Sequence, residues 1–207
     1  MRVLLAGFGP FPGAPRNPSA ALAQKLARRR RPALQALVRT AHVFDTSYAC
    51  VDRDMPELFA AKPDIVLVFG LAGRRQQICI ETRARNAVSV LVPDASGCRP
   101  ASGIIESAGA DVLAGRAPFV RLLGAARARN LPVRLSRDAG RYLCNYAYWR
   151  ALERAPEGRP AVVFVHIPAF ASPRPRRRQK KRRSPSFSQL LGAAERLLIA
   201  LAAASRR

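Results

Sequence analysis

The chain has 207 residues, 49% of them hydrophobic, so it can bury one substantial core, and a single domain spanning residues 1–207 is expected. Its formal net charge of +23 is extreme, but eight of these charges lie within residues 174–183 and the rest are scattered over helix-like segments, which indicates mostly solvated surface. No apolar run approaches the roughly 18–20 residues of a membrane span, which excludes a membrane protein and predicts a soluble, cytoplasmic one.

Strand-like apolar runs recur along the chain, and the first is the N-terminal segment. Its apolar part is only about five residues long before glycine and proline interrupt it, so we expect a strand there and not a secretory signal. Further runs follow near Leu34, Asp64, Leu131 and Ala161. Several are apolar at consecutive positions, which is typical of strands covered on both faces. The pattern predicts an α/β fold: a three-layer sandwich, with helices on both faces of a mixed, twisted sheet.

Helical segments separate these runs. Asn17 followed by Pro18 is a typical helix start, because asparagine caps the first turn and proline suits its geometry. Other helices are expected over residues 51–61, over residues 119–130 and after Tyr142. A final helix is expected over residues 187–204, where leucines and alanines form one apolar stripe suited to covering a sheet or a subunit contact.

Two segments depart from this alternation. Between residues 70 and 103 we expect two extended pieces around Asn86 and then a Pro-Asp turn, and such excursions at strand ends often carry functional sites. Residues 171–186 are rich in proline, serine and arginine, which predicts a mobile loop before the last helix. The basic run Arg174–Arg183 within it is a candidate contact for RNA or another polyanion.

The cysteines and histidines limit the chemistry that the chain can perform. Cys50, Cys79, Cys98 and Cys144 stand far apart without a C-x-x-C pair, and there are only two histidines. A zinc site is therefore not expected, and no other metal or cofactor is predicted. In a cytosolic chain an even number of cysteines is no argument for disulfides.

Cys144 lies in a favourable position for a nucleophile. It follows a glycine-marked turn and comes at the expected start of a helix, where partial positive charge and free N–H groups stabilise a thiolate. His166 ends a buried-looking strand, and carboxyl ends of strands meet amino ends of helices at one edge of an α/β sheet. We therefore expect His166 to serve as the base and Glu81, within the apolar "ICIE", to orient it. Asp94 is a second acid of the same region, which holds a loop or helps to shape the site.

Structural alternatives compete with each assignment. A lone cysteine after an apolar pair is more often a buried small residue, and a lone histidine at a strand end is more often structural. Glu81 is also compatible with an exposed strand position. On the pattern alone the catalytic interpretation of these three residues stays one of several hypotheses.

Four blocks of sequence, taken together, resemble the type I pyroglutamyl peptidases, a family of cysteine peptidases. They are "GFGPFPGAPRNPS" from Gly7, "GLAGRRQQICIETRARN" from Gly70, "PDASG" from Pro93, and "AGRYLCN" with "FVHIP" ending near Pro168. The resemblance implies a Cys-His-Glu site on Cys144, His166 and Glu81, with Asp94 at a further acidic position. It also implies a phosphorylase/hydrolase-like architecture and a homo-oligomer, either a dimer or a tetramer.

The reaction implied by the resemblance is removal of an N-terminal pyroglutamyl residue from a peptide through a thioester. Pyroglutamate is a small, flat, neutral lactam, so we expect apolar walls and a few polar contacts around it. Two of the expected residues have simpler structural interpretations, because Phe8 also suits the core and Asn17 also suits a helix cap. The expected substrate-binding residues are Phe8, Phe11, Asn17, Leu71, Val92 and Tyr142.

The sequence departs from the family pattern at three positions near the expected site. Leu71 replaces a common glutamine, Arg74 replaces a glycine, and Leu91 replaces an arginine. Substrate preference and rate are therefore open.

Two alternative functions remain at this point. One is an inactive family member that binds polyanions through its basic loop, although this loop lacks the aromatic residues expected of a single-strand binder, so nucleic acid is not the expected partner. The other is a phosphorylase, but "GFGPFPG" lacks the pattern of a phosphate-binding loop.

Overall fold

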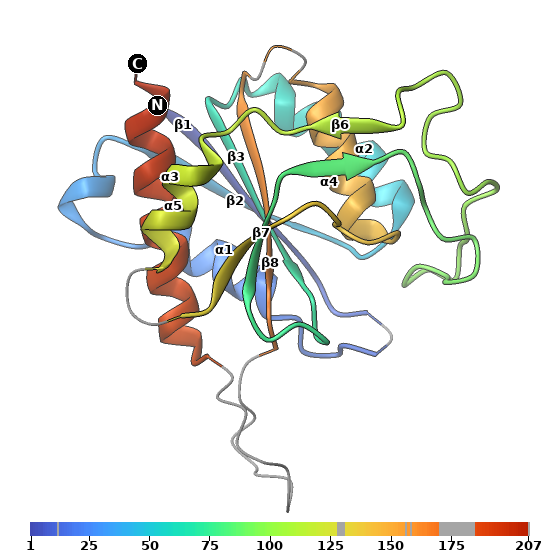
Figure 1. Cartoon of the computed structure of the whole chain (residues 1–207), viewed down its shortest axis with the longest axis horizontal. Helices are drawn as coiled ribbons and strands as arrows, with labels where there is room; N and C mark the ends of the chain where they lie inside the picture. The colour runs from blue at the N-terminus through green and yellow to red at the C-terminus, as the bar shows by residue number, and fades with distance from the viewer. Residues whose placement is uncertain (12, 128–130, 156, 158, 170–184, 207) are drawn as a thin grey trace, which may run out of the picture.

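A six-stranded sheet forms the centre of the molecule (Figure 1). The computed structural model describes the whole chain except residues 12, 128–130, 156, 158, 170–184 and 207. The strands run in the order β2-β1-β3-β8-β4-β7. Their bounds are β1 Arg2–Phe8, β2 Val38–Phe44, β3 Ile65–Leu71, β4 Ile78–Glu81, β7 Val133–Ser136 and β8 Ala161–Ile167.

Strand direction divides the sheet into two parts. The strands β2, β1, β3 and β8 are parallel to one another, whereas β4 is antiparallel to β8 and β7 is parallel to β4. The first six residues of β3 and the last six of β8 are all buried. This continuous burial confirms the prediction, made from their unbroken apolar runs, that helices cover both faces of the sheet.

The helices form two layers, one on each face. On one face, α1 (Pro18–Ala27), α3 (Phe119–Arg127) and α5 (Phe187–Ser205) share a buried cluster with alternate residues of the strands. On the other face, α2 (Tyr48–Ala60) and α4 (Leu143–Glu153) bury the remaining strand residues. The predicted three-layer α/β sandwich with a mixed sheet is confirmed.

The C-terminal helix α5 covers the sheet with its predicted apolar stripe. Leu190, Leu197 and Leu201 are buried in it, and a capping box between Ser186 and Gln189 begins the helix. Among the described residues, α5 alone is long and apolar enough to cross a membrane, which by itself is weak evidence for a membrane span. The predicted mobile loop at 171–186 falls almost entirely outside the described residues.

One predicted strand begins later than expected. The apolar run from Leu34 was expected to form a strand, but Pro32–Leu34 forms a short 3-10 helix and β2 begins only at Val38. Proline fixes its own backbone angle and lacks an N–H group, so it starts a helical turn readily and cannot complete a strand ladder.

The excursion after Gly70 also differs from the prediction. Its first piece is β4 of the main sheet, and the next strand, β5 (Arg83–Arg85), pairs with a strand that was not predicted, β6 (Val112–Ala114). Residues 87–111 form no strand. The side chain of Asn86 accepts hydrogen bonds from the N–H groups of Ile105 and Glu106. The chain after Asn86 is therefore held to a distant segment, not to a neighbouring hairpin strand.

The closest approach between β1 and α1 occurs at Gly7. A Cβ atom added there would lie 2.4 Å from the backbone oxygen of Ser19. The same contact is fixed by a hydrogen bond from the Phe8 N–H to Ser19 Oγ, at 3.0 Å. A glycine is therefore required where the helix begins to cross the sheet.

We predict that Gly7→Ala lowers the free energy of unfolding by about 1–3 kcal/mol, because the added methyl group meets backbone that cannot move aside. Urea unfolding followed by circular dichroism measures the change. Gly124→Ala in the exposed face of α3 is the matched control, since a Cβ there meets nothing within 4 Å. It should stabilise the protein by about 0.5–1 kcal/mol, and an equal effect of both variants would contradict the prediction.

Candidate active site

The thiol of Cys144 lies at the start of α4. Tyr142 is the N-cap of this helix, so Cys144 is its second helical residue. The preceding turn contains Gly140 with a φ of +85°, a conformation that favours glycine. The N–H groups of a first helical turn have no acceptor within the helix. They leave partial positive charge around the half-buried sulfur, as the sequence predicted.

His166 reaches this sulfur from the carboxyl end of β8. It is buried, with only 4% of its surface exposed, and its ring packs against Phe164 with the ring centroids 5.0 Å apart. Cys144 is close enough to the imidazole for its charge to raise the pKa of His166. The predicted meeting of a strand end with a helix start therefore brings these two residues together.

Gly70 leaves room for the sulfur. It is the partner of His166 in the register between β3 and β8. A Cβ atom on Gly70 would lie 2.8 Å from Cys144 Sγ and 2.7 Å from the ring of Phe164. The thiol therefore packs directly against the backbone of β3.

Glu81 approaches the imidazole from the antiparallel strand β4. In the register of β4 with β8, Cys79 is opposite His166 and Glu81 is opposite Phe164. Glu81 is thus a diagonal neighbour of His166 on the same face of the sheet. Its Oε1 accepts a hydrogen bond from His166 Nδ1 at 2.8 Å, and the carboxylate is fully buried. The expected orienting acid therefore lies beside the imidazole, at the end of an extended segment that belongs to the main sheet.

The surroundings of His166 determine the protonation of its imidazole, which lies between Cys144 and Glu81. Burial alone lowers the pKa of His166, because it disfavours a charged ring. The negative charge of the Cys144 thiolate and hydrogen bonds to Cys144 and Glu81 oppose this effect and raise the pKa to about 9. The raised pKa means that His166 holds its proton near neutral pH and can give it to a leaving group.

Arg75 is a member of the site that the sequence interpretation missed. Its NH1 lies 2.6 Å from Glu81 Oε1, and its NH2 donates to the backbone oxygen of Asp138 at 2.6 Å. One arginine among 36 lysines and arginines carried no signal of its own. The only available signal for Arg75 was its position six residues before Glu81, on the other side of a turn.

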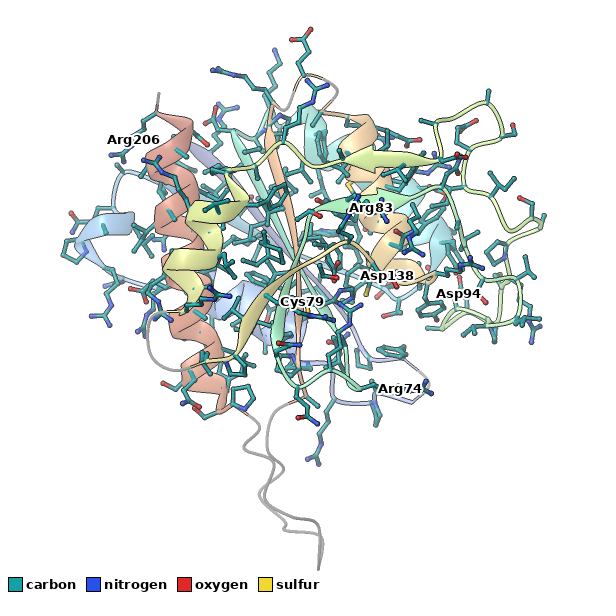
Figure 2. All side chains as sticks on the ribbon, viewed as in Figure 1. Arg74, Cys79, Arg83, Asp94, Asp138 and Arg206 are labelled. Atoms are coloured by element: carbon teal, nitrogen blue, oxygen red, sulfur yellow. The ribbon has the colours of Figure 1, made fainter. Side chains whose placement is uncertain are left out.

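Asp94 is buried but does not contact the imidazole. Its carboxylate accepts hydrogen bonds from the N–H groups of Ser96 and Cys98, and from Tyr48 at the start of α2. In Figure 2, Asp94 lies among the loops well away from Cys79, the neighbour of Glu81 on β4. Of the two roles expected for Asp94, the structure favours holding the loop.

Aromatic side chains of the expected pocket divide into two groups. Phe8 is 2% exposed and packs on Phe44 and Phe164, so it is a core residue. Phe11 is only partly buried, and its ring centroid lies 6.3 Å from that of Tyr142. The negative charge of Cys144 contributes to a raised pKa of Tyr142, after burial and the charge of Asp94. Phe11 and Tyr142 therefore form a partly exposed aromatic pair, and Tyr142 lies near Cys144.

The remaining expected contacts differ in their surroundings. Asn17 caps α1: its Oδ1 accepts from Ser19 and its Nδ2 donates to the backbone oxygen of Gly9. Leu71 ends β3 directly after Gly70 and is partly exposed. Val92 is 48% exposed and lies outside both buried clusters. Leu71 is thus the member of this set that the backbone places nearest to the sulfur.

Asn145, the residue after the nucleophile, was also missed. It is fully buried and forms three hydrogen bonds of 2.8–2.9 Å with the backbone of Arg85 and Ala87. These bonds fix the first turn of α4 against β5. A buried asparagine directly after the cysteine was the available signal, because an uncharged polar side chain in a core requires partners.

A half-buried thiol, an imidazole beside it and a buried carboxylate hydrogen-bonded to that imidazole form a row typical of the site of a cysteine hydrolase. Among the described residues, no group of three or more histidines, cysteines or acidic residues is arranged to hold a metal ion. The chemistry that the row can perform is nucleophilic attack by sulfur followed by proton transfer from the ring.

Comparison with known proteins gives the family. The profile of the family described as pyroglutamyl peptidase matches residues 1–207. A pyrrolidone-carboxylate peptidase of Gloeobacter violaceus is 33% identical over 170 residues, covering 81% of this chain and 82% of that protein. The chain therefore belongs to the pyroglutamyl peptidase family.

Solved structures agree with the fold. Pyroglutamyl peptidase I of Bacillus amyloliquefaciens superposes with a TM-score of 0.82 at 26% identity, covering 98% of this chain and 97% of that one. Pyrrolidone carboxyl peptidase from Thermococcus litoralis superposes with a TM-score of 0.86 at 25% identity, covering 98% of this chain and 93% of that one. The family resemblance drawn from the sequence blocks is thereby confirmed.

We predict that Gly70→Ala slows alkylation of Cys144 by iodoacetamide about tenfold to a hundredfold, because the new methyl group displaces the sulfur from the imidazole. Mass spectrometry of the Cys144 peptide over a time course measures the rate. Gly73→Ala is the control, since a Cβ at that position meets nothing within 4 Å. Unchanged alkylation in Gly70→Ala would show that the sulfur does not depend on this close approach.

Proposed function

We propose that this protein is a cysteine exopeptidase that hydrolyses the amide bond after an N-terminal pyroglutamyl residue. The observation that carries the proposal is the row formed by Cys144, His166 and Glu81, in which Glu81 is hydrogen-bonded to the imidazole beside the thiol, in a chain of the pyroglutamyl peptidase family. Cys144 acts as the nucleophile, His166 as the acid and base, and Glu81 as the group that orients the ring.

In the first half of the reaction the Cys144 thiolate attacks the pyroglutamyl carbonyl carbon. The sulfur–carbon bond forms as the carbonyl oxygen takes the negative charge. His166 Nδ1 is engaged by Glu81, so Nε2 gives its proton to the leaving amine as the carbon–nitrogen bond breaks. The products are a thioester on Cys144, a neutral imidazole and the shortened peptide.

In the second half water cleaves the thioester. Neutral His166 takes a proton from the water, whose oxygen attacks the thioester carbon. The carbon–sulfur bond breaks, pyroglutamate leaves, and the thiolate and imidazolium form again. Glu81 stabilises the imidazolium in both halves without giving up its own charge.

The developing oxyanion requires donors that already point at it. The backbone N–H of Cys144, in the first turn of α4, is the nearest such donor. Asn145 holds this turn rigid through its bonds to Arg85 and Ala87. A fixed donor stabilises charge without reorganising during the reaction.

The lactam ring is proposed to lie between apolar side chains at the exposed side of the sulfur. Phe11 and Tyr142 supply an aromatic wall, and Leu71 supplies an aliphatic one. Tyr142 also donates from its hydroxyl to the backbone oxygen of Pro93, which holds the segment containing Val92 beside the ring. Leucine at position 71 offers no side-chain hydrogen bond, so backbone groups must recognise the lactam polar atoms.

The alternative of a polyanion-binding protein receives no support from the comparisons, which all point to peptidases. The basic run from Arg174 to Arg183 lies outside the described residues. We also propose a cytoplasmic location, which fits four free cysteines, one of them exposed.

We further propose a homo-oligomer, a dimer or a tetramer. Leu91, Val92 and Ile104 are 81%, 48% and 54% exposed on the segment between β5 and β6, and exposed apolar side chains on one segment suit a subunit contact. Light scattering should give a mass of two or four chains, and Leu91→Asp should shift it toward one. A monomer at micromolar concentration would refute the proposal.

For the peptidase itself, we predict that Cys144→Ser lowers kcat/KM for a pyroglutamyl chromogenic amide at least about a thousandfold, because a hydroxyl is far less ionised than this thiol. Iodoacetamide should block the wild-type enzyme in the same proportion as it labels Cys144.

Two controls separate this outcome from loss of structure or general amide hydrolysis. Cys98→Ser removes the exposed cysteine and should leave the rate within about twofold of wild type. The corresponding prolyl amide, with a protonated amine in place of the lactam, should not be cleaved. Full activity of Cys144→Ser would remove Cys144 as the nucleophile.

A further inference from the structure

Arg75 occupies the far end of the catalytic row. Its NH1 lies 2.6 Å from the same Glu81 oxygen that accepts from His166, while its own side chain is 24% exposed. From the sulfur outward, the charges alternate: thiolate, imidazolium, carboxylate and guanidinium. The last member has no part in the reaction itself and touches no reacting atom.

Glu81 requires a compensating cation. Its carboxylate is completely buried, and its second oxygen, Oε2, has no hydrogen-bond partner among the described residues. A buried carboxylate without compensation takes up a proton or destabilises the fold. His166 alone cannot supply constant compensation, because it loses its charge during the reaction, whereas an arginine stays charged throughout.

Arg75 also joins the acid to the segment that leads to the nucleophile. Its NH2 donates to the backbone oxygen of Asp138 at 2.6 Å, and its NH1 lies 3.5 Å from Ser136 Oγ. Asp138 in turn accepts from the N–H of Gly140, two residues before the N-cap of α4. One guanidinium therefore contacts both the carboxylate and the backbone of the segment that precedes α4.

We propose that Arg75 is a positioning residue that keeps Glu81 ionised and so maintains the thiolate of Cys144 through His166. The inference rests on the proposed function, since it assigns Arg75 a role in that same row. Arg75 acts through Glu81 and not on the substrate. Its removal should therefore change the reactivity of the sulfur even when no substrate is present.

Other titratable or charged groups face this row, and each differs from Arg75 in its contacts. Burial is the main cause of the raised pKa values of Tyr142 and Tyr148. Arg134 donates a hydrogen bond to the Cys79 sulfur at 3.4 Å. Cys79 also lies close enough to Arg75 to contribute to the raised pKa of that arginine, after burial and Glu81. The titratable or charged groups that face the row are Tyr142 and Tyr148 from α4, Cys79 from β4, Arg134 from β7 and Asp138 from the segment after β7.

The test is the pH dependence of Cys144 alkylation by iodoacetamide in the full chain, read by mass spectrometry of the Cys144 peptide. In wild type the half-maximal rate should fall below about pH 7, under the value of roughly 8.5 for a free thiol. In Arg75→Met the midpoint should rise by at least about one pH unit, which slows alkylation at neutral pH about tenfold. Arg75→Lys, which keeps the charge, should shift it less.

The matched control is Arg74→Met. Arg74 is the exposed neighbour of Arg75, and its loss removes the same charge and length of side chain. It should leave the midpoint within about 0.2 pH units of wild type. An equal shift in Arg74→Met would mean that general surface charge is responsible and would overturn the proposal.

A double-variant cycle tests whether Arg75 acts through Glu81. Glu81→Gln alone should raise the midpoint, and adding Arg75→Met to it should produce little further change, because the charge to be compensated is gone. The double variant also leaves no unpaired buried charge, so it keeps the test open if Arg75→Met alone does not fold. Additive shifts would overturn the proposal.

Two failures can be told apart. If wild-type Cys144 shows no reactivity below pH 8, the proposed function fails. If wild type is reactive but Arg75→Met keeps the same pH midpoint of alkylation and only lowers the melting temperature, Arg75 only stabilises the fold and the inference fails.

Discussion

A carboxylate buried in the sheet is the constraint on which the site depends. Glu81 is excluded from water, and in the proposed reaction its carboxylate is the group that stabilises the imidazolium of His166. In a medium of low polarity such a charge costs several kcal/mol unless partners compensate it. The surrounding structure supplies one cation on each side, His166 and Arg75, at 2.8 and 2.6 Å from the same oxygen.

The mixed sheet makes this arrangement geometrically available. In the parallel part of the sheet, the carboxyl ends of β3 and β8 and the start of α4 meet at one edge, which brings Gly70, His166 and Cys144 together. An acid from another parallel strand end would lie at the same exposed edge. Because β4 runs in the opposite direction, Glu81 enters deeper in the sheet, beside Phe164, where water does not reach it.

Several features of the site were predictable from local chemistry. A cysteine at a helix start and a histidine at the end of a buried strand follow from patterns a few residues long, and the structure brings both to one edge as expected. Asn17 followed by proline gave the helix cap correctly. Phe8 was ambiguous, because a phenylalanine next to a glycine turn suits a core and a pocket equally, and only packing against Phe44 and Phe164 decides between them.

The sequence by itself determined most of the order of strands and helices and the covered sheet, and it indicated the three side chains of the proposed site, because these depend on apolar periodicity and on residue chemistry. The tertiary structure alone decided the direction of β4, the pairing of β5 with β6 and the selection of Arg75 from many arginines. Each of these depends on contacts between residues distant in the chain. Such contacts are selected by the burial of the whole molecule, and no local pattern records them.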